Sequence, residues 1–235
     1  MMTFNIYVPS YRRYNKILTY HKLQYCTYVV RKSEEALYRS AGIESILSVE
    51  DSLINSFEKV VNWLLDHAPE DVIAVIDDDI EEFYHRIEAL EKLTPEETTL
   101  EIERTAQLIA DLDLGYACCP IDTNVKYYDR PFKFVGVNGG VKIFNRRILT
   151  DNRFNLKFKF LSDIDFELHE LMKRRIILIT NYFCNNAKVD TNEGGNNSNK
   201  SLREIESENQ ELSLKWGKYY KKANGRSTGR VSVTR

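Results

Sequence analysis

Three consecutive aspartates, Asp77-Asp78-Asp79, directly follow the apolar run Val72–Ile76. The run is too short for a helix of its own and is rich in β-branched residues, which predicts a buried strand ending at the aspartates. Closely packed carboxylates repel one another unless a cation lies among them. A hard cation such as Mg²⁺ or Mn²⁺ binds through oxygen and commonly carries substrate phosphates, so the triplet predicts a metal site. A solvated acidic turn or a helix N-terminus is the alternative.

A second acidic pair, Asp163 and Asp165, lies in the run Leu161-Ser162-Asp163-Ile164-Asp165-Phe166. Ser162 predicts the N-cap of a helix that ends near Lys173, and a helix N-terminus stabilises a nearby carboxylate. A carboxylate in that place can accept a proton from an acceptor hydroxyl as a general base. Helix capping alone would also explain either aspartate, so both interpretations stay open.

Aromatic and basic residues follow the first two predicted strands. Pro9-Ser10-Tyr11-Arg12-Arg13 comes after the first strand, and Arg31 comes after the second. Tyr11 can stack on a nucleobase, and arginine can fork onto phosphate or ribose oxygens, although surface solubility would explain Arg12 or Arg13 alone. The sequence has no glycine-rich phosphate loop of the Walker or dinucleotide type, so a metal would have to neutralise more of a diphosphate.

Gly139 and Gly140, in the run Val137-Asn138-Gly139-Gly140, are further candidates for ligand binding. Glycine allows a backbone to approach a ligand closely because it has no side chain. A tight hairpin at Asn138-Gly139 would explain the same residues equally well.

The elements that must position these residues alternate between strand and helix. This alternation predicts an α/β fold with a mostly parallel sheet covered by helices on both faces. Ligands bind such sheets at the carboxyl ends of the strands, where the candidate residues meet. The predicted strands are 4–8, 27–30, 45–49, 72–76, 116–121, 140–144 and 176–180. The predicted helices are 33–41, 52–67, 80–93, 95–114, 162–173 and 202–220.

Length and composition indicate one domain with a sizeable core, because the chain has 235 residues and a net charge of −2. No apolar stretch reaches the length of a membrane span, so we expect no membrane partner. The four cysteines, Cys26, Cys118, Cys119 and Cys184, show no metal-ligand spacing. Reduced thiols in a cytoplasm are the simpler interpretation.

Charge is distributed unevenly along the chain. Residues 215–235 contain seven Lys or Arg and no Asp or Glu, whereas residues 1–214 carry the compensating acidic excess. We therefore expect a domain over residues 1–214 and a basic, flexible C-terminal tail over residues 215–235. Such a tail suggests contact with a polyanion, and a solvated, partly disordered terminus is the equal alternative.

These residues together resemble a known family. The strand ending in Asp77-Asp78-Asp79 resembles the DxD motif of GT-A glycosyltransferases, whose metal binds a nucleotide-sugar diphosphate. The opening Ile6-Tyr7-Val8-Pro9-Ser10-Tyr11-Arg12-Arg13 is similar to their nucleotide-binding first strand and loop, and residues 162–166 look like their acceptor-side motif. More narrowly, Tyr28-Val29-Val30-Arg31, Ile76–Ile80, Gly139-Gly140 and Lys215-Trp216-Gly217 resemble phage TET-associated glycosyltransferases, which are implied to glycosylate 5-hydroxymethylpyrimidines in DNA.

The resemblance implies a GT-A-like, Rossmann-like fold with a helical C-terminal extension, and a role for each candidate. Asp79 and Asp77 would bind Mn²⁺ or Mg²⁺, and Asp77 or Asp78 would instead bind the ribose. Asp163 would be the base, supported by Asp165. Pro9, Ser10, Tyr11, Arg12, Arg31, Gly139 and Gly140 would contact the donor, for which a UDP-sugar is expected.

The resemblance has two departures and leaves the acceptor open. No histidine follows His169 to serve as a late metal ligand, so Asp190, Asn192 or a loop oxygen would have to substitute. Ser162 stands where the family's acceptor-side motif often has glutamate. The expected acceptor is DNA containing hydroxymethylated pyrimidine. A polysaccharide, lipid or protein acceptor is the first alternative, and a non-catalytic DNA-binding module is the second.

Overall fold

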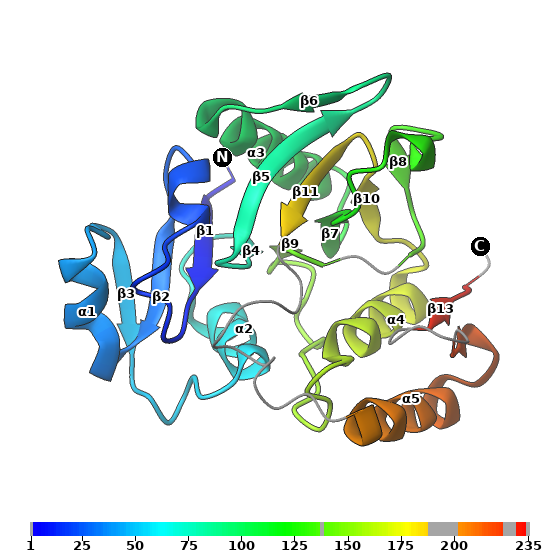
Figure 1. The fold of residues 1–235 in the computed structure, drawn as a ribbon. Helices are drawn as coiled ribbons and strands as arrows, with labels where there is room; N and C mark the ends of the chain where they lie inside the picture. Colours follow the sequence, from blue (N-terminus) through cyan, green and yellow to red (C-terminus); the bar gives the residue numbers. More distant parts are fainter. Residues whose placement is uncertain (1, 137–138, 188–201, 223–228, 234–235) are drawn as a thin grey trace.

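The computed structural model describes residues 2–136, 139–187, 202–222 and 229–233 (Figure 1). The α-helices are α1 (Glu35–Ser40), α2 (Phe57–His67), α3 (Pro95–Asp111), α4 (Ser162–Arg174) and α5 (Leu202–Trp216). The strands are β1 (Phe4–Pro9), β2 (Thr27–Arg31), β3 (Ile46–Val49), β4 (Val72–Ile76), β5 (Ile80–Arg86), β6 (Leu90–Lys92), β7 (Tyr116–Cys119), β8 (Phe132–Lys133), β9 (Val141–Asn145), β10 (Leu178–Thr180), β11 (Phe183–Ala187), β12 (Tyr220–Lys221) and β13 (Arg230–Val231).

The central sheet has the strand order β3-β2-β1-β4-β9-β7-β10-β8. Four of its neighbouring pairs are parallel, and the three pairs β4–β9, β9–β7 and β10–β8 are antiparallel. The predicted α/β architecture with a mostly parallel sheet is therefore confirmed. Strand β9 enters between β4 and β7 in the opposite direction, with Lys142 opposite Val75 on one side and Cys118 on the other.

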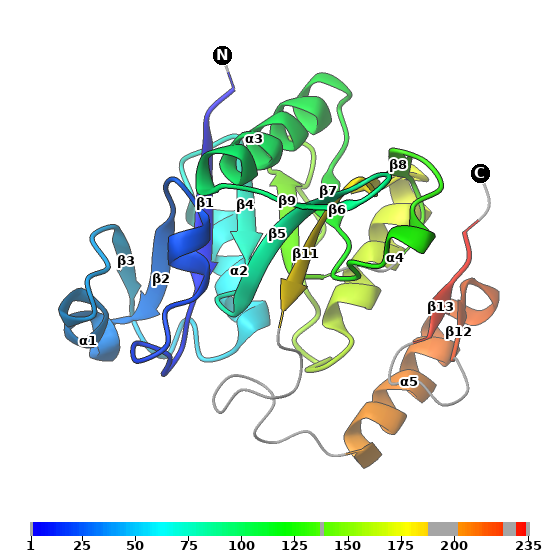
Figure 2. The same cartoon turned by 45° about the horizontal axis from the view of Figure 1, so that its top comes forward.

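The sheet separates two hydrophobic cores, because successive side chains of a strand point to opposite faces. Ile73 and Val75 of β4 pack into the core that contains α2 and α4. Val72, Ala74 and Ile76 pack into the core that contains α3 and the small sheet β11-β5-β6. The small sheet and the helices are seen from two directions in Figures 1 and 2.

Strand β4, which leads into the three aspartates, is completely buried. All five of its side chains have 0% exposure, as the sequence predicted. Complete burial of a valine or isoleucine side chain contributes about 1.5–3 kcal/mol, so the strand is held firmly in the sheet. The three aspartates therefore leave the sheet from a fixed point.

Residues 80–93 form the hairpin of β5 and β6, and the prediction of a helix there is wrong. In β5 the buried residues are Ile80, Phe83 and Arg86, and this spacing of three imitates one face of a helix. Strand β5 pairs with β11, which the sequence did not predict as a strand. Non-local pairing therefore decided the structure of this segment.

Side-chain caps mark the starts of α2 and α3 but not the start of α4. The predicted capping box of α3 is confirmed, since the Thr94 side chain accepts from the Glu97 backbone N–H and the Glu97 side chain accepts from the Thr94 backbone N–H. Helix α2 begins at Phe57 with Ser56 as its N-cap, five residues later than predicted. Helix α4 begins at Ser162, and its N-cap is Leu161 rather than the predicted Ser162.

The C-terminal segment packs on the body over its described residues. Helix α5 lies beside α4 in both views (Figures 1 and 2). Strands β12 and β13 pair with each other, and Leu212, Tyr220, Val231 and Val233 are buried in the core that contains α2 and α4. Burial of these apolar side chains attaches the C-terminal segment to the body at these positions.

The four cysteines are buried free thiols. Over the part of the chain that the structure describes, no helix combines the length and the apolar character that crossing a membrane requires.

Candidate active site

A cavity of about 620 Å³ opens at the carboxyl ends of β1, β2 and β4 and at the N-termini of α2 and α4. This is the edge at which the sequence placed a ligand site. Nine of the predicted site residues line the cavity: Pro9, Ser10, Tyr11, Arg12, Arg31, Asp77, Asp78, Asp79 and Asp163. The structure thus gathers the aspartate triplet, Asp163 and the aromatic-basic loop Pro9–Arg13 in one place.

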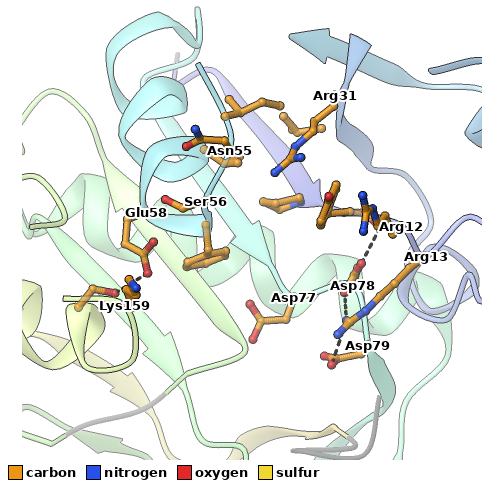
Figure 3. Close-up of a pocket in the computed structure, with 18 of the residues that line it drawn as sticks. Arg12, Arg13, Arg31, Asn55, Ser56, Glu58, Asp77, Asp78, Asp79 and Lys159 are labelled. Carbon is orange, nitrogen blue, oxygen red and sulfur yellow. Dashed lines mark hydrogen bonds and ion pairs between the residues drawn. The ribbon is translucent and has the colours of Figure 1, made fainter. Parts of the chain in front are cut away.

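Asp78 and Asp79 are joined by Arg13 (Figure 3). The Arg13 Nη1 donates to an Asp78 carboxylate oxygen and lies 3.1 Å from Asp79 Oδ2. Ser10 Oγ donates to the other Asp78 oxygen at 2.5 Å, and its own partner is Tyr38 Oη at 2.7 Å. Burial raises the pKa of Asp78 to about 6, although the Arg13 charge opposes that rise.

Asp77 is fixed through its backbone. Its N–H donates to the carbonyl of Gly140 at 2.9 Å. Its carbonyl accepts from Thr19 Oγ1 at 2.7 Å, and Thr19 Oγ1 accepts in turn from the Ile80 N–H. The side chain of Asp77 remains partly exposed in the cavity. The backbone anchors therefore set the position of the carboxylate and leave it open to a ligand.

Lys142 is a buried cation in the same cavity, and the sequence analysis did not single it out. Its Nζ lies 3.8 Å from Asp77 Oδ1, and it lies over the Phe57 ring at 5.2 Å. Burial lowers the pKa of Lys142, but the charges of Asp77 and Asp163 outweigh that effect and raise it. The signal was present in the sequence, since Lys142 is a lone charge inside the apolar run of β9.

Asp163 lies in the first turn of α4, as predicted. Burial raises the pKa of its carboxyl group, while Lys142 acts in the opposite direction. Its Oδ1 accepts from the Ile164 N–H at 2.8 Å, which is the local contact expected at a helix N-terminus. Lys142 thus interacts electrostatically both with Asp77 at the end of β4 and with Asp163 at the start of α4.

The donor chemistry of the strand-end carboxylates fits a hard divalent cation. Within the described residues, no group of three or more His, Cys, Asp or Glu could hold a metal by itself. Magnesium in phosphate sites is usually bound by one or two carboxylates together with substrate phosphates. Asp77 and Asp79 can provide these carboxylates. Asp190 and Asn192, the expected substitutes for a late histidine, lie outside the described residues.

The structural comparisons identify the fold. No protein-family model matches the sequence, and no curated protein matches it. Glucosyl-3-phosphoglycerate synthase from Mycobacterium tuberculosis is similar in its complex with Mn²⁺, UDP-glucose and glycerol 3-phosphate, with a TM-score of 0.56 and 11% identity over 90% of this chain and 79% of that chain. Its complex with Mg²⁺ and UDP gives a TM-score of 0.54, also at 11% identity over 90% of this chain and 79% of that one. The chain has a GT-A-like fold.

Residues 1–349 of S. aureus TarS also match, at 14% identity and with a lower TM-score of 0.48. The match covers 79% of this chain and 60% of that chain, so this chain spans about three-fifths of the TarS fragment.

The aromatic-basic loop of the GT-A-like fold is held by α1 and the turn before it. Arg12 adopts a left-handed backbone conformation with φ +57°, and its N–H donates to Glu34 Oε2 at 3.0 Å. The Arg31 guanidinium lies 3.7 Å from the centre of the Tyr11 ring, and that of Arg12 lies 4.9 Å from it. One flat aromatic group and two cations are thus presented together at one wall of the cavity.

Glu58 and Ser162 form a buried contact on the opposite wall, which sequence reasoning missed. Ser162 Oγ donates to Glu58 Oε1 at 3.0 Å, and both residues line the cavity. Burial raises the pKa of Glu58. The contact ties the first turn of α2 to the first turn of α4 across 104 residues of sequence. Such a separation leaves no local pattern from which to predict it.

Three predicted site residues do not line the cavity: Asp165, Gly139 and Gly140. The Asp165 carboxylate accepts from Lys215 Nζ at 2.7 and 2.8 Å and from Trp216 Nε1 at 2.7 Å. Asp165 therefore pairs with the C-terminal helix rather than with Asp163. Gly140 acts through its carbonyl contact with Asp77, and Gly139 has only ordinary neighbours.

Proposed function

We propose that this protein is a metal-dependent glycosyltransferase that moves a sugar from a nucleotide-sugar, with a UDP-sugar as the expected donor, to an acceptor hydroxyl. The observation that supports this most directly is the cavity at the strand ends of a GT-A-like fold, which gathers Asp77, Asp79 and Asp163 with the Tyr11 loop. Proteins of similar fold were solved with Mn²⁺ or Mg²⁺ and UDP or UDP-glucose. The carboxylate oxygens of Asp77 and Asp79 are ligands of the kind that these hard cations prefer.

On the donor side, Tyr11 provides a surface for a nucleobase, and Arg12 and Arg31 provide donors for ribose or phosphate oxygens. Pro9 and Ser10 shape the loop. Asp77 or Asp78 would instead bind the ribose of the donor. Asp79 and Asp77 would hold Mn²⁺ or Mg²⁺, which when bound would neutralise charge on the departing diphosphate.

On the acceptor side, Asp163 would accept the hydroxyl proton or orient the hydroxyl. A general base works best when its pKa is close to the working pH, and burial raises the pKa of Asp163 in that direction. Lys142 keeps Asp163 and Asp77 close together by offsetting their repulsion. Asp165 supports Asp163 by its attachment to α5 and takes no part in proton transfer.

For the acceptor we propose 5-hydroxymethylpyrimidine in DNA, flipped out or unpaired for access. The support is the resemblance of the motif order to phage TET-associated glycosyltransferases. Lys215 and Trp216 of that motif set bind Asp165 in this structure, so the DNA backbone would be held by other basic residues of the segment.

The test is a screen of nucleotide-sugars with Mn²⁺ or Mg²⁺ and DNA that carries 5-hydroxymethylcytosine, 5-hydroxymethyluracil or neither. The masses of the digested nucleosides report transfer. We expect a hexose mass on the modified base only, abolished by chelation and by Asp79→Asn, and unchanged by Asp129→Asn, an exposed residue outside the cavity.

Metal-dependent cleavage of the donor without transfer to DNA would keep the glycosyltransferase and reject the DNA acceptor. Polysaccharide, lipid and protein hydroxyls would then be the acceptors to screen. If no nucleotide-sugar is bound or cleaved with either metal, the proposed function is wrong.

A further inference from the structure

Glu208 of α5 binds three consecutive backbone N–H groups of the segment that leads into α4. Its Oε1 accepts from the Lys159 N–H at 2.8 Å. Its Oε2 accepts from the N–H groups of Phe160 and Leu161, both at 3.0 Å. The side chain is buried, with 8% exposure. Hydrogen bonds from N–H groups to an ionised carboxylate are about twice as strong as neutral ones, so this is a firm attachment.

The attached segment forms part of the cavity. Lys159 and Phe160 line it, and Asp163 follows within one helical turn. Leu161 is the N-cap of α4 and provides no side-chain cap of its own. The N–H groups at a helix start have no partner within the helix, and Glu208 accepts from one of them, that of Leu161, from 47 residues further along the chain.

A second attachment lies on the other side of Asp163. Asp165 is bound by Lys215 and Trp216, at the last turn of the same α5. Asp163 thus lies between two points that are both held by the C-terminal helix. Glu208 also acts on Asp163 through its charge. Burial is the largest cause that raises the pKa of Asp163, and the Glu208 charge acts in the same direction.

We propose that Glu208 is a positioning residue for acceptor-side chemistry, which holds the segment 159–161 so that Asp163 meets the acceptor hydroxyl. The role assigned to Asp163 rests on the proposed function, whereas the attachment itself does not. Glu208 touches neither donor nor acceptor in this assignment, and it is absent from the cavity lining. Its substitution should therefore impair acceptor use and leave donor binding intact.

The first experiment compares Glu208→Gln with Glu211→Gln. Glutamine at 208 keeps the shape but offers one acceptor oxygen in place of two, so at least one of the three N–H groups loses its partner. Glu211 lies one turn further along α5 and pairs with Lys157 at 2.9 Å, which makes it a matched control for the loss of a carboxylate. Sugar transfer to the acceptor and the affinity for the donor are measured separately.

We expect Glu208→Gln to lower kcat for transfer by about 10- to 100-fold, because a misplacement of about 1 Å has costs of that order. Donor affinity, measured by calorimetry with Mn²⁺ and UDP, should stay within about twofold of the wild type. Glu211→Gln should match the wild type in both. Unchanged transfer by Glu208→Gln, or a parallel loss of donor affinity, would overturn the proposal.

The second experiment measures hydrogen exchange and needs no substrate. The amides of residues 159–161 should exchange at least about tenfold faster in Glu208→Gln, and not in Glu211→Gln. If the wild type neither binds nor cleaves a nucleotide-sugar but these amides respond, the proposed function fails and the attachment stands. If Glu208→Gln and the charge-retaining Glu208→Asp both lose protection throughout the central sheet, Glu208 acts on global stability and the positioning role is wrong.

Discussion

Arg13 Nη1 lies 3.1 Å from Asp79 Oδ2 while it also binds Asp78. A guanidinium therefore already supplies positive charge at the carboxylate that we assign to a metal. Burial lowers the pKa of Arg13, but the charges of Asp78 and Asp79 overcome this and raise it, so the side chain stays charged. A divalent cation at Asp79 would compete with the contact of Arg13 to Asp79 and leave its contact to Asp78 in place.

Arg13→Gln should therefore strengthen metal binding and weaken donor binding. Removal of the competing cation should lower the Kd for Mn²⁺ alone by about threefold. This is about half of the 1.4 kcal/mol that corresponds to a tenfold change in Kd. Loss of a cation beside the diphosphate should raise KM for the donor by about tenfold. Calorimetry with Mn²⁺ and initial-rate kinetics measure the two effects. Arg39→Gln, which removes a surface pair with Glu35, is the control. Weaker Mn²⁺ binding by Arg13→Gln would contradict the competition.

Lys142→Met should both destabilise the fold and reduce catalysis. The substitution leaves Asp77 and Asp163 without the buried cation that offsets their repulsion, and removal of one partner of a buried charge pair costs about 3–5 kcal/mol. The longer separation of 3.8 Å to Asp77 points to the lower end of that range. Denaturant unfolding measures the loss, and Lys142→Arg should recover most of the stability. If Lys142→Met unfolds at the wild-type denaturant midpoint, the assigned role of Lys142 is wrong.

Glu58→Gln should change how stability depends on pH. Burial raises the pKa of Glu58, so the folded state binds the proton more tightly than the unfolded state. Stability from this group is therefore fully present below the ordinary glutamate pKa, and it falls as pH rises towards the raised value. Glutamine can still accept from Ser162 Oγ and carries no charge.

The variant should accordingly melt at a higher temperature than the wild type at pH 7, and the difference should vanish near about pH 3.5, where glutamate is protonated. Thermal unfolding followed by circular dichroism across this range provides the measurement. Glu44→Gln, at an exposed position, controls for the change in net charge. Equal melting temperatures at pH 7 would contradict the prediction.

Gly140→Ala should destabilise the protein by about 1–3 kcal/mol, the usual cost of a strained backbone conformation. Gly140 has φ +88°, and a Cβ there would lie 2.9 Å from the Asn185 amide. Two other glycines separate the causes. Gly42 has φ +90° with no atom near the added Cβ, and Gly139 would meet its closest neighbour at 3.5 Å.

We expect Gly42→Ala to show the backbone cost alone and Gly139→Ala to show neither cost. Denaturant midpoints rank the three variants, and the predicted order of loss is Gly140, Gly42, Gly139. Donor KM should rise only for Gly140→Ala, because the Gly140 carbonyl accepts from Asp77. If Gly139→Ala loses as much stability as Gly140→Ala, the attribution of the loss to backbone strain and steric contact is wrong.

The strand-end part of the site could be predicted because its information is local. An apolar run followed by Asp77, Asp78 and Asp79 defines a buried strand and its polar end within eight residues. Parallel pairing of β4 with β1 and of β1 with β2 then places Tyr11 and Arg31 at the same edge. The alternation of strands and helices was enough to infer a mostly parallel sheet, although not the order of its strands.

The rest depended on contacts between distant segments. Asp165 has the residue type and position of a catalytic partner, and its contacts with Lys215 and Trp216, 50 and 51 residues later, show that its carboxylate is already engaged. Strand β5 has helix-like spacing in the sequence, and its partner β11 begins nearly a hundred residues after it ends. Lys142 is a charged residue in an apolar run of the sequence. Its importance depends on Asp77 and Asp163, whose charges act on it only in the folded structure.

The attachment of Glu208 and Lys215 to the start of α4 also bears on how the protein is made. A ribosome adds these residues after every strand of the central sheet, so a nascent chain can assemble the nucleotide half of the cavity while the wall that carries Asp163 still lacks its support. On the roles assigned here, the chain therefore becomes able to position an acceptor only after α5 has been synthesised.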